Sequence, residues 1–207
     1  MSVTISKHPL VLDKISRIRD LNTPNHEFRR LMSEVAMLLG YEVTANLPLK
    51  DSKVRTPLAV AKTKKISKEV VFVGILRAGL GLMDGLMKIF PEARLAHIGI
   101  YRDEETLKPV KYYIRFPEDL KDKIIILADP MLATGGSAVE ALNLIKSRGA
   151  KEIHFVCLIA ARSGIEYLKK YHKDVNVYAG CVDEKLNENG YIVPGLGDAG
   201  DRMFGTN

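Results

Sequence analysis

The sequence has few of the residues that disulfide frameworks, zinc sites and membrane spans require. Only two of its 207 residues are cysteine, Cys157 and Cys181, and they form no CxxC pair, so no disulfide scaffold is expected. None of the five histidines pair at i, i+4, which argues against a zinc motif of the HExxH kind. The longest apolar run, Val70–Leu76, is too short to cross a bilayer. The first residues show no apolar segment behind a basic start, so we expect no secretory signal and a cytoplasmic location.

The charge balance favours anionic partners. The sequence has 31 Lys and Arg against 25 Asp and Glu, a net charge of +6, which suits either nucleic acid or a polyphosphate ligand. The densest basic run, KTKKISK at 62–68, is short and is predicted to be a loop before a strand. With 46% hydrophobic and 27% charged residues, the composition is that of a globular protein. The length of 207 residues suits one domain, 1–207, or one domain with an added subdomain.

A first helix is predicted to start at Pro24, with Thr23 as its N-cap and Gly40 at its end. Its apolar residues recur at helical spacing: Phe28, Leu31, Met32, Val35, Leu38 and Leu39. This helical arm must pack on something, and it suggests a surface that another subunit covers.

After the arm, apolar strands alternate with helices. Strands are predicted at 70–76, 94–100, 123–128, 153–160 and 175–179, and helices at 80–90, 137–148 and 164–171. This alternation predicts an α/β fold, a parallel β-sheet flanked by helices on both faces. Ligands of such sheets bind at the carboxyl ends of strands, so the candidate site follows Leu76, Ile100 and Ala128.

The most informative segment is DPMLATGGS at 129–137, which joins a buried strand to a helix. Its glycines let backbone N–H groups converge, and the helix N-terminus favours negative charge, so the segment predicts a phosphate cradle. The alternative is an ordinary N-capped helix after a Gly-rich turn. The candidate residues are Asp129, Pro130, Met131, Leu132, Ala133, Thr134, Gly135, Gly136 and Ser137.

Two better-known phosphate motifs are excluded. No GKS or GKT occurs, so there is no Walker A loop. A GxGxxG pattern does occur at Gly195, Gly197 and Gly200, but only seven residues follow it. That is too short for the helix and second strand of a dinucleotide-binding unit.

Two further loops follow predicted strands. In ILRAGLG at 75–81, Arg77 can offer its planar fork to a pyrophosphate; the alternative is a surface arginine at a strand end. The polar stretch YRDEET at 101–106 continues to about Lys111 and is predicted to be a mobile flap with Arg102 at its root. A solvated hairpin is the alternative for that stretch.

The tail GYIVPGLGDAGDRMFGT at 190–206 is rich in glycine but too apolar for a solvated terminus. Its apolar residues are Tyr191, Ile192, Val193, Leu196 and Phe204. A Gly-rich backbone that is held in place can approach a flat ligand closely.

Taken together, DPMLATGGS, GYIVPGLGDAGD, ILRAGLG and YRDEET make the chain resemble the uracil phosphoribosyltransferases over essentially its whole length. The resemblance implies a type I phosphoribosyltransferase fold with an N-terminal helical arm and a small hood from the terminal segments. The core would cover about 65–180, and a base-recognition segment would cover about 181–207. It also implies transfer of the phosphoribosyl group of phosphoribosyl pyrophosphate (PRPP) to N1 of uracil, giving UMP and pyrophosphate. Mg²⁺ would be carried by PRPP, with no protein ligand assigned.

The resemblance also implies a role for each matched residue. PRPP would be bound by Arg77, Ala78, Gly79, Arg102, residues 129–137 and Asp198. Uracil would be bound by Ile192, Gly197, Asp198 and Ala199. The catalytic residues would be Arg77, Arg102, Asp129 and Asp198, with the proton-accepting role of Asp198 left open.

The chain departs from related patterns in two places. Phosphoribosyltransferases at large have two adjacent acids where this chain has Asp129 and Pro130, but the uracil branch shares that change. Arg162 and Ser163 stand where proline and glutamate are expected, in a segment that we expect to be peripheral.

Two alternatives remain beside this reading. One is an RNA-binding regulator on the same fold that senses uridine nucleotides, although no clustered basic face or stacking aromatics are evident and nucleic acid is not expected as a partner. The other is a purine or orotate phosphoribosyltransferase, which lacks the PGLGDAGD tail. Relatives form dimers or larger assemblies, so a homo-oligomer, dimer or tetramer, is expected. Whether GTP activates the enzyme, as in part of the family, is left open.

Overall fold

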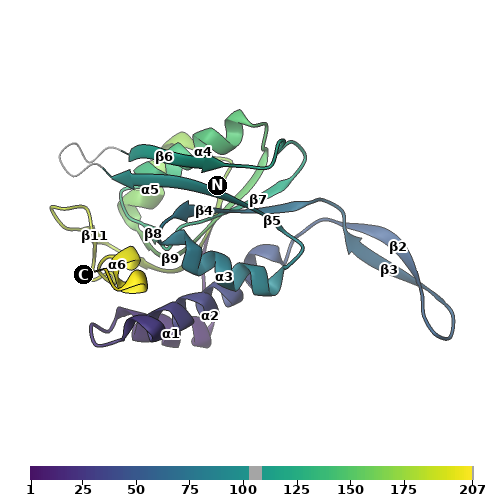
Figure 1. Ribbon diagram of the computed structural model, residues 1–207, viewed down its shortest axis with the longest axis horizontal. Helices are drawn as coiled ribbons and strands as arrows, with labels where there is room; N and C mark the ends of the chain where they lie inside the picture. The colour runs from purple at the N-terminus through teal and green to yellow at the C-terminus, as the bar shows by residue number, and fades with distance from the viewer. Residues whose placement is uncertain (103–108, 207) are drawn as a thin grey trace.

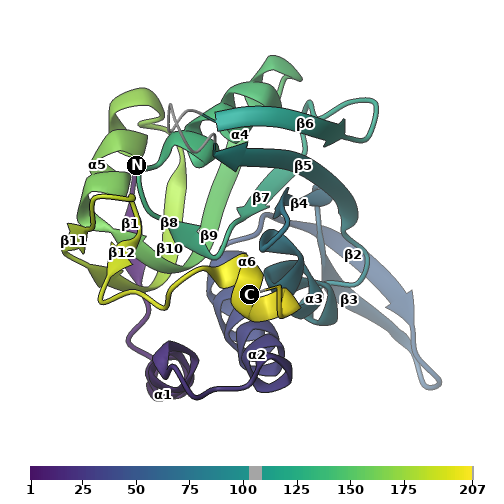
Figure 2. The same cartoon turned by 60° about the vertical axis from the view of Figure 1, so that its left-hand side comes forward.

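The computed structural model describes residues 1–102 and 109–206, with only the backbone of residues 102 and 109. It contains a central sheet with helices on both faces and a hairpin that projects from one side (Figures 1 and 2). The strands of the sheet are β1 (Val3–Ile5), β4 (Val70–Leu76), β5 (Arg94–Arg102), β6 (Pro109–Arg115), β7 (Ile124–Ala128), β8 (Met131–Leu132), β9 (Glu152–Ala161) and β10 (Asn176–Asp183). The helices are α1 (Pro9–Arg19), α2 (Asn25–Thr44), α3 (Gly79–Ile89), α4 (Gly136–Ser147), α5 (Arg162–Tyr171) and α6 (Ala199–Phe204).

The sheet confirms the predicted α/β class. Its strand order is β1-β10-β9-β7-β4-β5-β6, with β8 beside β9. All described neighbours run parallel except β5 and β6, which are antiparallel. Residues 109–111, predicted to belong to the flap, are part of β6 instead. The rest of that prediction falls on residues 103–108, which lie outside the described residues.

Apolar side chains of the central strands point alternately to two cores, as the pleat requires. In β4, Phe72 joins the core beneath α1, α2 and α3, whereas Val73 joins the core beneath α4 and α5. A strand that is buried on both faces has no polar positions. This explains the uninterrupted VVFVGIL sequence, which was predicted as a strand with the observed boundaries.

The helical arm is α2, and its apolar face is covered within the chain. Phe28, Leu31, Met32, Val35 and Leu39 have no exposed surface and belong to the core with α3 and the sheet. The inference that this face marks a subunit interface was therefore wrong.

The boundaries of α2 also differ from the prediction. Thr23 Oγ1 donates to the carbonyl of Arg17 at 2.6 Å, so Pro24 takes the N-cap position. The helix continues through Gly40 to Thr44. A Cβ at Gly40 would lie 3.1 Å from Leu86 Cδ2, so this glycine permits close packing against α3 and does not end the helix.

Several short elements were not predicted. The projecting hairpin, called here the β-arm, consists of β2 (Leu49–Arg55) and β3 (Val60–Ile66), which pair antiparallel. The basic run predicted as a loop is thus mostly strand, and both faces of the β-arm lack a buried apolar row. A second two-stranded sheet joins β11 (Lys185–Leu186) to β12 (Ile192–Val193). Among the described residues, no helix is long and apolar enough to cross a membrane.

Candidate functional site

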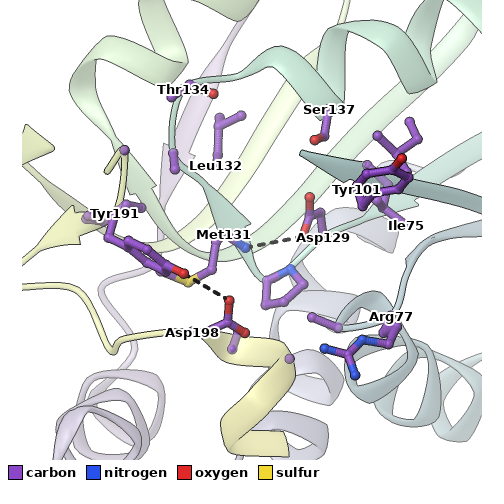
Figure 3. A pocket seen from close by; sticks show the side chains of 18 of the residues that line it. Ile75, Arg77, Tyr101, Asp129, Met131, Leu132, Thr134, Ser137, Tyr191 and Asp198 are labelled. Atoms are coloured by element: carbon purple, nitrogen blue, oxygen red, sulfur yellow. Dashed lines mark hydrogen bonds between the residues drawn. The ribbon is translucent and has the colours of Figure 1, made fainter. Parts of the chain in front are cut away.

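A pocket of about 1040 Å³ opens at the carboxyl ends of β4, β5 and β7. The ends of β4 and β5 and the residues that follow β4 and β7 form one side, and the C-terminal segment forms the other (Figure 3). The sheet therefore brings together the loops that were predicted to carry the chemistry, at the edge where parallel α/β sheets bind ligands.

The loop after β7, residues 129–135, leads into α4 and lines the pocket. Gly135 has a φ of 85°, a left-handed conformation that places it directly before the helix. No side chain caps α4, so its first turn presents backbone N–H groups and the positive end of the helix dipole. Thr134 and Ser137 flank that turn in the pocket (Figure 3). This arrangement suits a phosphate dianion.

The loop is supported from behind by the segment that was expected to be peripheral. β8 within the loop pairs with the end of β9, and Gly164 in the first turn of α5 packs directly on the loop backbone. A Cβ at Gly164 would lie 2.3 Å from the carbonyl oxygen of Ala133 and 2.6 Å from that of Leu132. The segment 161–164 is therefore adjacent to the site, because the β8–β9 pairing brings its end under the loop.

Replacing Gly164 with alanine is expected to displace this loop. The clash involves backbone oxygens, which no side-chain rotation can relieve, so we expect a stability loss of about 1–3 kcal/mol. Since the loop would move together with Gly164, kcat/KM for a substrate whose phosphate binds this loop should fall by up to about 10²-fold. Urea unfolding and steady-state kinetics measure the two effects. Exposed Ser163 provides the control, and a Gly164→Ala enzyme as active as Ser163→Ala would contradict the assigned support.

Arg77 enters the pocket from the end of β4 (Figure 3). Its Nη2 donates to Asp201 Oδ1 at 3.0 Å, and its guanidinium lies 5.6 Å from the ring centroid of Phe204. The hydroxyl of Thr206 and the guanidinium of Arg77 hold the pKa of Asp201 below its ordinary value. Arg77 thus rests against an ionised carboxylate of α6 while more than half of its side chain is exposed.

The C-terminal segment lines the opposite side of the pocket with buried backbone. Ile192 and Ala199 are each 4% exposed. Asp198 caps α6, with Oδ1 accepting from the backbone N–H of Asp201 at 2.8 Å. The hydroxyl of Tyr191 donates to Asp198 Oδ2 at 3.5 Å (Figure 3). The prediction that this Gly-rich tail is ordered is confirmed.

Most residues with a predicted role lie on this pocket. Those that line it are Arg77, Ala78, Asp129, Pro130, Met131, Leu132, Ala133, Thr134, Gly135, Ser137, Ile192, Gly197, Asp198 and Ala199. Gly79 and Gly136, the first residues of α3 and α4, do not line it. Arg102 ends β5, and its side chain lies outside the described part of the chain.

Other lining residues were not singled out from the sequence: Ile75, Ile100, Tyr112, Ala138, Glu188, Asn189, Gly190, Gly200 and Asp201. Asp201 is the second acid of the GDAGD sequence at 197–201. The repeated Gly-Asp pair was the signal from which a role for Asp201 could have been predicted. Tyr112 lies in β6, which pairs antiparallel with β5. Because a flap was predicted to run to about Lys111, this strand pairing was not expected.

The fold and the pocket define a phosphoribosyltransferase-like structure. The solved structure of APRTase from Giardia lamblia complexed with 9-deazaadenine matches with a TM-score of 0.53 and 17% identity over 76% of this chain and 86% of that one. At this identity the likeness shows the fold alone. The AQ2163 protein from Aquifex aeolicus matches far more fully, with a TM-score of 0.94 and 39% identity over 98% of this chain and 97% of that one.

The chain belongs to the uracil phosphoribosyltransferase family, whose model matches residues 5–206. The uracil phosphoribosyltransferase of Clostridium perfringens strain 13 is 55% identical over 205 residues, covering 99% of this chain and 98% of the relative. That of Bacillus pumilus is 56% identical with the same coverage. The resemblance inferred from the four motifs is thereby confirmed.

Proposed function

We propose that the pocket transfers the phosphoribosyl group of PRPP to N1 of uracil, giving UMP and releasing pyrophosphate. The observation that carries the proposal is that a phosphate-type loop, 129–137, and a Gly-rich backbone segment, 192–199, line opposite sides of one pocket. Family membership supplies the reaction and the base. The chain would act as one domain, with its core at about 65–180 and its base-recognition segment at about 181–207.

The loop would bind the phosphoribosyl half of PRPP. The first turn of α4, with Thr134 and Ser137, would hold the 5′-phosphate, for the reasons of backbone geometry and helix dipole given above. Asp129 would accept hydrogen bonds from the ribose hydroxyls. Arg77 with Ala78 and Gly79, together with Arg102, would face the pyrophosphate.

Displacement at C1′ builds oxocarbenium character on the ribose and negative charge on the pyrophosphate. The chain's contribution would be to position the two substrates and to stabilise the leaving charge with arginine side chains. The family generally uses Mg²⁺ with PRPP. Among the described residues, no group of three or more His, Cys, Asp or Glu could hold a metal ion, and Asp129 supplies a single carboxylate of the kind Mg²⁺ binds. This fits an ion carried by PRPP, where it would neutralise pyrophosphate charge.

The direct test is pyrophosphate release from PRPP and Mg²⁺ with uracil, cytosine, hypoxanthine or orotate offered separately. Release with uracil alone, accompanied by UMP, is expected. Release with another base would leave the PRPP site in place and overturn the role of residues 192–199. No release with any base, with or without GTP, would favour the RNA-binding regulator, and a salt-sensitive gel shift with RNA would then test that function.

We further propose that the β-arm is covered by a second copy of the chain. It projects from the body (Figure 1) and carries apolar side chains in water, with Leu49 60%, Leu58 97% and Val60 66% exposed. An apolar patch that a protein leaves exposed can mark an interaction site, whereas apolar residues exposed singly are normal on a surface.

Shortening the β-arm is therefore expected to reduce the oligomer to a monomer. Residues 51–64 would be replaced by an Asn-Gly turn, which suits a two-residue hairpin. The core should persist, because β2 and β3 pair only with each other. Sedimentation velocity measures the result, with Leu58→Ser as a milder variant. An unchanged oligomer, or a monomeric parent protein, would count against this interface.

A further inference from the structure

An ion pair outside the pocket joins α1 to the base-recognition segment. Arg19, at the end of α1, donates from Nη1 to Asp183 Oδ2 and from Nη2 to Asp183 Oδ1, both at 2.7 Å. Asp183 is only 8% exposed, one of few charged or polar residues in the described interior. Neither residue lines the pocket, and none of the proposed chemistry uses them.

The pair binds both backbone groups of one residue in the tail, Gly195. Arg19 Nη1 also donates to the carbonyl oxygen of Gly195 at 2.7 Å, and the N–H of Gly195 donates to Asp183 Oδ2 at 2.9 Å. Gly195 has a φ of +55°, and a Cβ there would lie 2.1 Å from the carbonyl oxygen of Ile192. The chain therefore folds back tightly on itself at the point that the ion pair holds.

A second arginine ties the same two segments together. Arg202 Nη1 donates to the carbonyl oxygens of Leu196 at 2.8 Å and Ile18 at 2.7 Å, and its Nη2 donates to that of Asp20 at 2.6 Å. Arg202 thus links Ile18 and Asp20, the neighbours of Arg19, to Leu196, the residue that follows Gly195. The end of α1 acts as a fixed support for the turn at 195–196.

The charge of the pair is maintained at neutral pH. Burial raises the pKa of the Asp183 carboxyl, but hydrogen bonds from Arg19 and from the Gly195 N–H outweigh burial and bring the pKa below its ordinary value of 3.8. A charged carboxylate that receives three hydrogen bonds is held in one orientation. A neutral pair could not hold the turn in this way.

We propose that Arg19 and Asp183 are positioning residues for uracil: their ion pair fixes the turn at Gly195 and thereby sets the geometry of the backbone that reads the base. Ile192 precedes this turn and Gly197 follows it, and both are proposed uracil contacts that line the pocket. This inference rests on the proposed function. It adds a determinant of base affinity that lies on a different element, α1, and does not touch the base.

The test uses Arg19→Lys and Asp183→Asn in the full-length enzyme. Lysine keeps the charge but loses the fork that holds both carboxylate oxygens; asparagine keeps the shape but loses the charge. We expect KM for uracil to rise on the order of 10-fold, while KM for PRPP stays within about two-fold. The preference for uracil over cytosine should fall in parallel, since the loop no longer holds one geometry.

A matched control is available in Arg162 and Glu184. This pair is also bidentate, at 2.7 and 2.6 Å, but its side chains are 62% and 63% exposed and it joins α5 to the chain just after β10. Arg162→Lys should leave KM for uracil unchanged. The control separates loss of any local ion pair from loss of the support for Gly195.

Urea unfolding separates positioning from stability. Arg19→Lys retains a cation beside Asp183 and is expected to fold even if Asp183→Asn does not. A folded Arg19→Lys enzyme with an unchanged KM for uracil and unchanged base preference would overturn the proposal, because a merely structural pair lowers stability alone. Failure of the parent enzyme to use uracil would instead overturn the proposed function.

Discussion

Replacing Arg77 with alanine is expected to lower kcat by on the order of 10²–10³, the usual effect of losing one preorganised donor to a developing charge. Among the residues that the structure describes, Arg77 is the one arginine that lines the pocket, and it enters from the end of β4. Pyrophosphate carries more negative charge as it leaves C1′, so an arginine placed there stabilises the transition state more than the ground state. The loss should therefore fall mainly on kcat.

The fold should survive this change. The side chain of Arg77 is 54% exposed, and its ion pair with Asp201 is of the exposed kind that contributes little to stability. Initial-rate measurements at saturating PRPP and uracil give kcat, and urea unfolding checks the fold. Arg77→Lys keeps the charge but loses the planar fork, so its kcat should lie between those of the parent enzyme and Arg77→Ala. Arg162→Ala, which removes an exposed arginine beyond the pocket, is the control. Near-normal turnover of Arg77→Ala would remove it from the site.

The central fold could be predicted because its signals are local. Strands such as β4 and β7 are buried on both faces and therefore appear as uninterrupted apolar runs. Each is followed by a glycine-bearing turn and a helix, so the position of Asp129 and Arg77 at neighbouring strand ends follows from the fold class. Residues 129–137 were located for this reason, without any contact being known.

The prediction of a loop at 62–68 and the inclusion of 109–111 in a flap were wrong for the opposite reason. Both faces of the β-arm are in water, so Lys62–Ile66 carries no apolar alternation by which a strand is recognised. Its pairing is sustained by backbone hydrogen bonds and by cross-strand contacts such as Lys64 with Asp51, 2.6 Å apart. The apolar stripe of α2 was visible, but a stripe does not say whether its cover lies in the same chain.

Long-range polar contacts were hidden for a third reason. Arg19 binds Asp183, which lies 164 positions away in the sequence, and Arg202 donates to the carbonyl of Ile18, 184 positions away. No periodicity relates such residues, and each of the three charged residues alone would pass for an ordinary surface charge. Likewise, the position of Gly164 beneath the phosphate loop depends on the pairing of β8 with β9. The residues that shape the site from behind could therefore be found only from the structure.

Base discrimination is the largest effect that we expect. Uracil presents acceptors at O2 and O4 and a donor at N3, whereas cytosine reverses donor and acceptor at N3 and the exocyclic position. The backbone between Ile192 and Ala199, both 4% exposed, can offer fixed N–H and C=O groups to that edge. Gly197 has a φ of +80°, a conformation that favours glycine, and the absence of a side chain leaves its peptide groups uncovered.

A backbone site of this kind cannot rotate its donors into acceptors. Cytosine would leave buried polar groups unpaired, and sites built on such hydrogen bonds reject the mismatched ligand by roughly 10⁴-fold. We therefore expect kcat/KM with PRPP to favour uracil over cytosine by that order.

The measurement compares kcat/KM for the two bases at fixed PRPP, with 5-fluorouracil as the matched control. That analogue keeps O2, N3–H and O4, so it should be used with an efficiency near that of uracil if the hydrogen-bonding edge decides recognition. Rejection of 5-fluorouracil as well as cytosine would indicate that the site excludes a substituent at the 5-position in addition to reading the hydrogen-bonding edge. Comparable kcat/KM for cytosine and uracil would mean that the backbone from Ile192 to Ala199 does not read the base, because fixed donors and acceptors cannot satisfy both patterns at once.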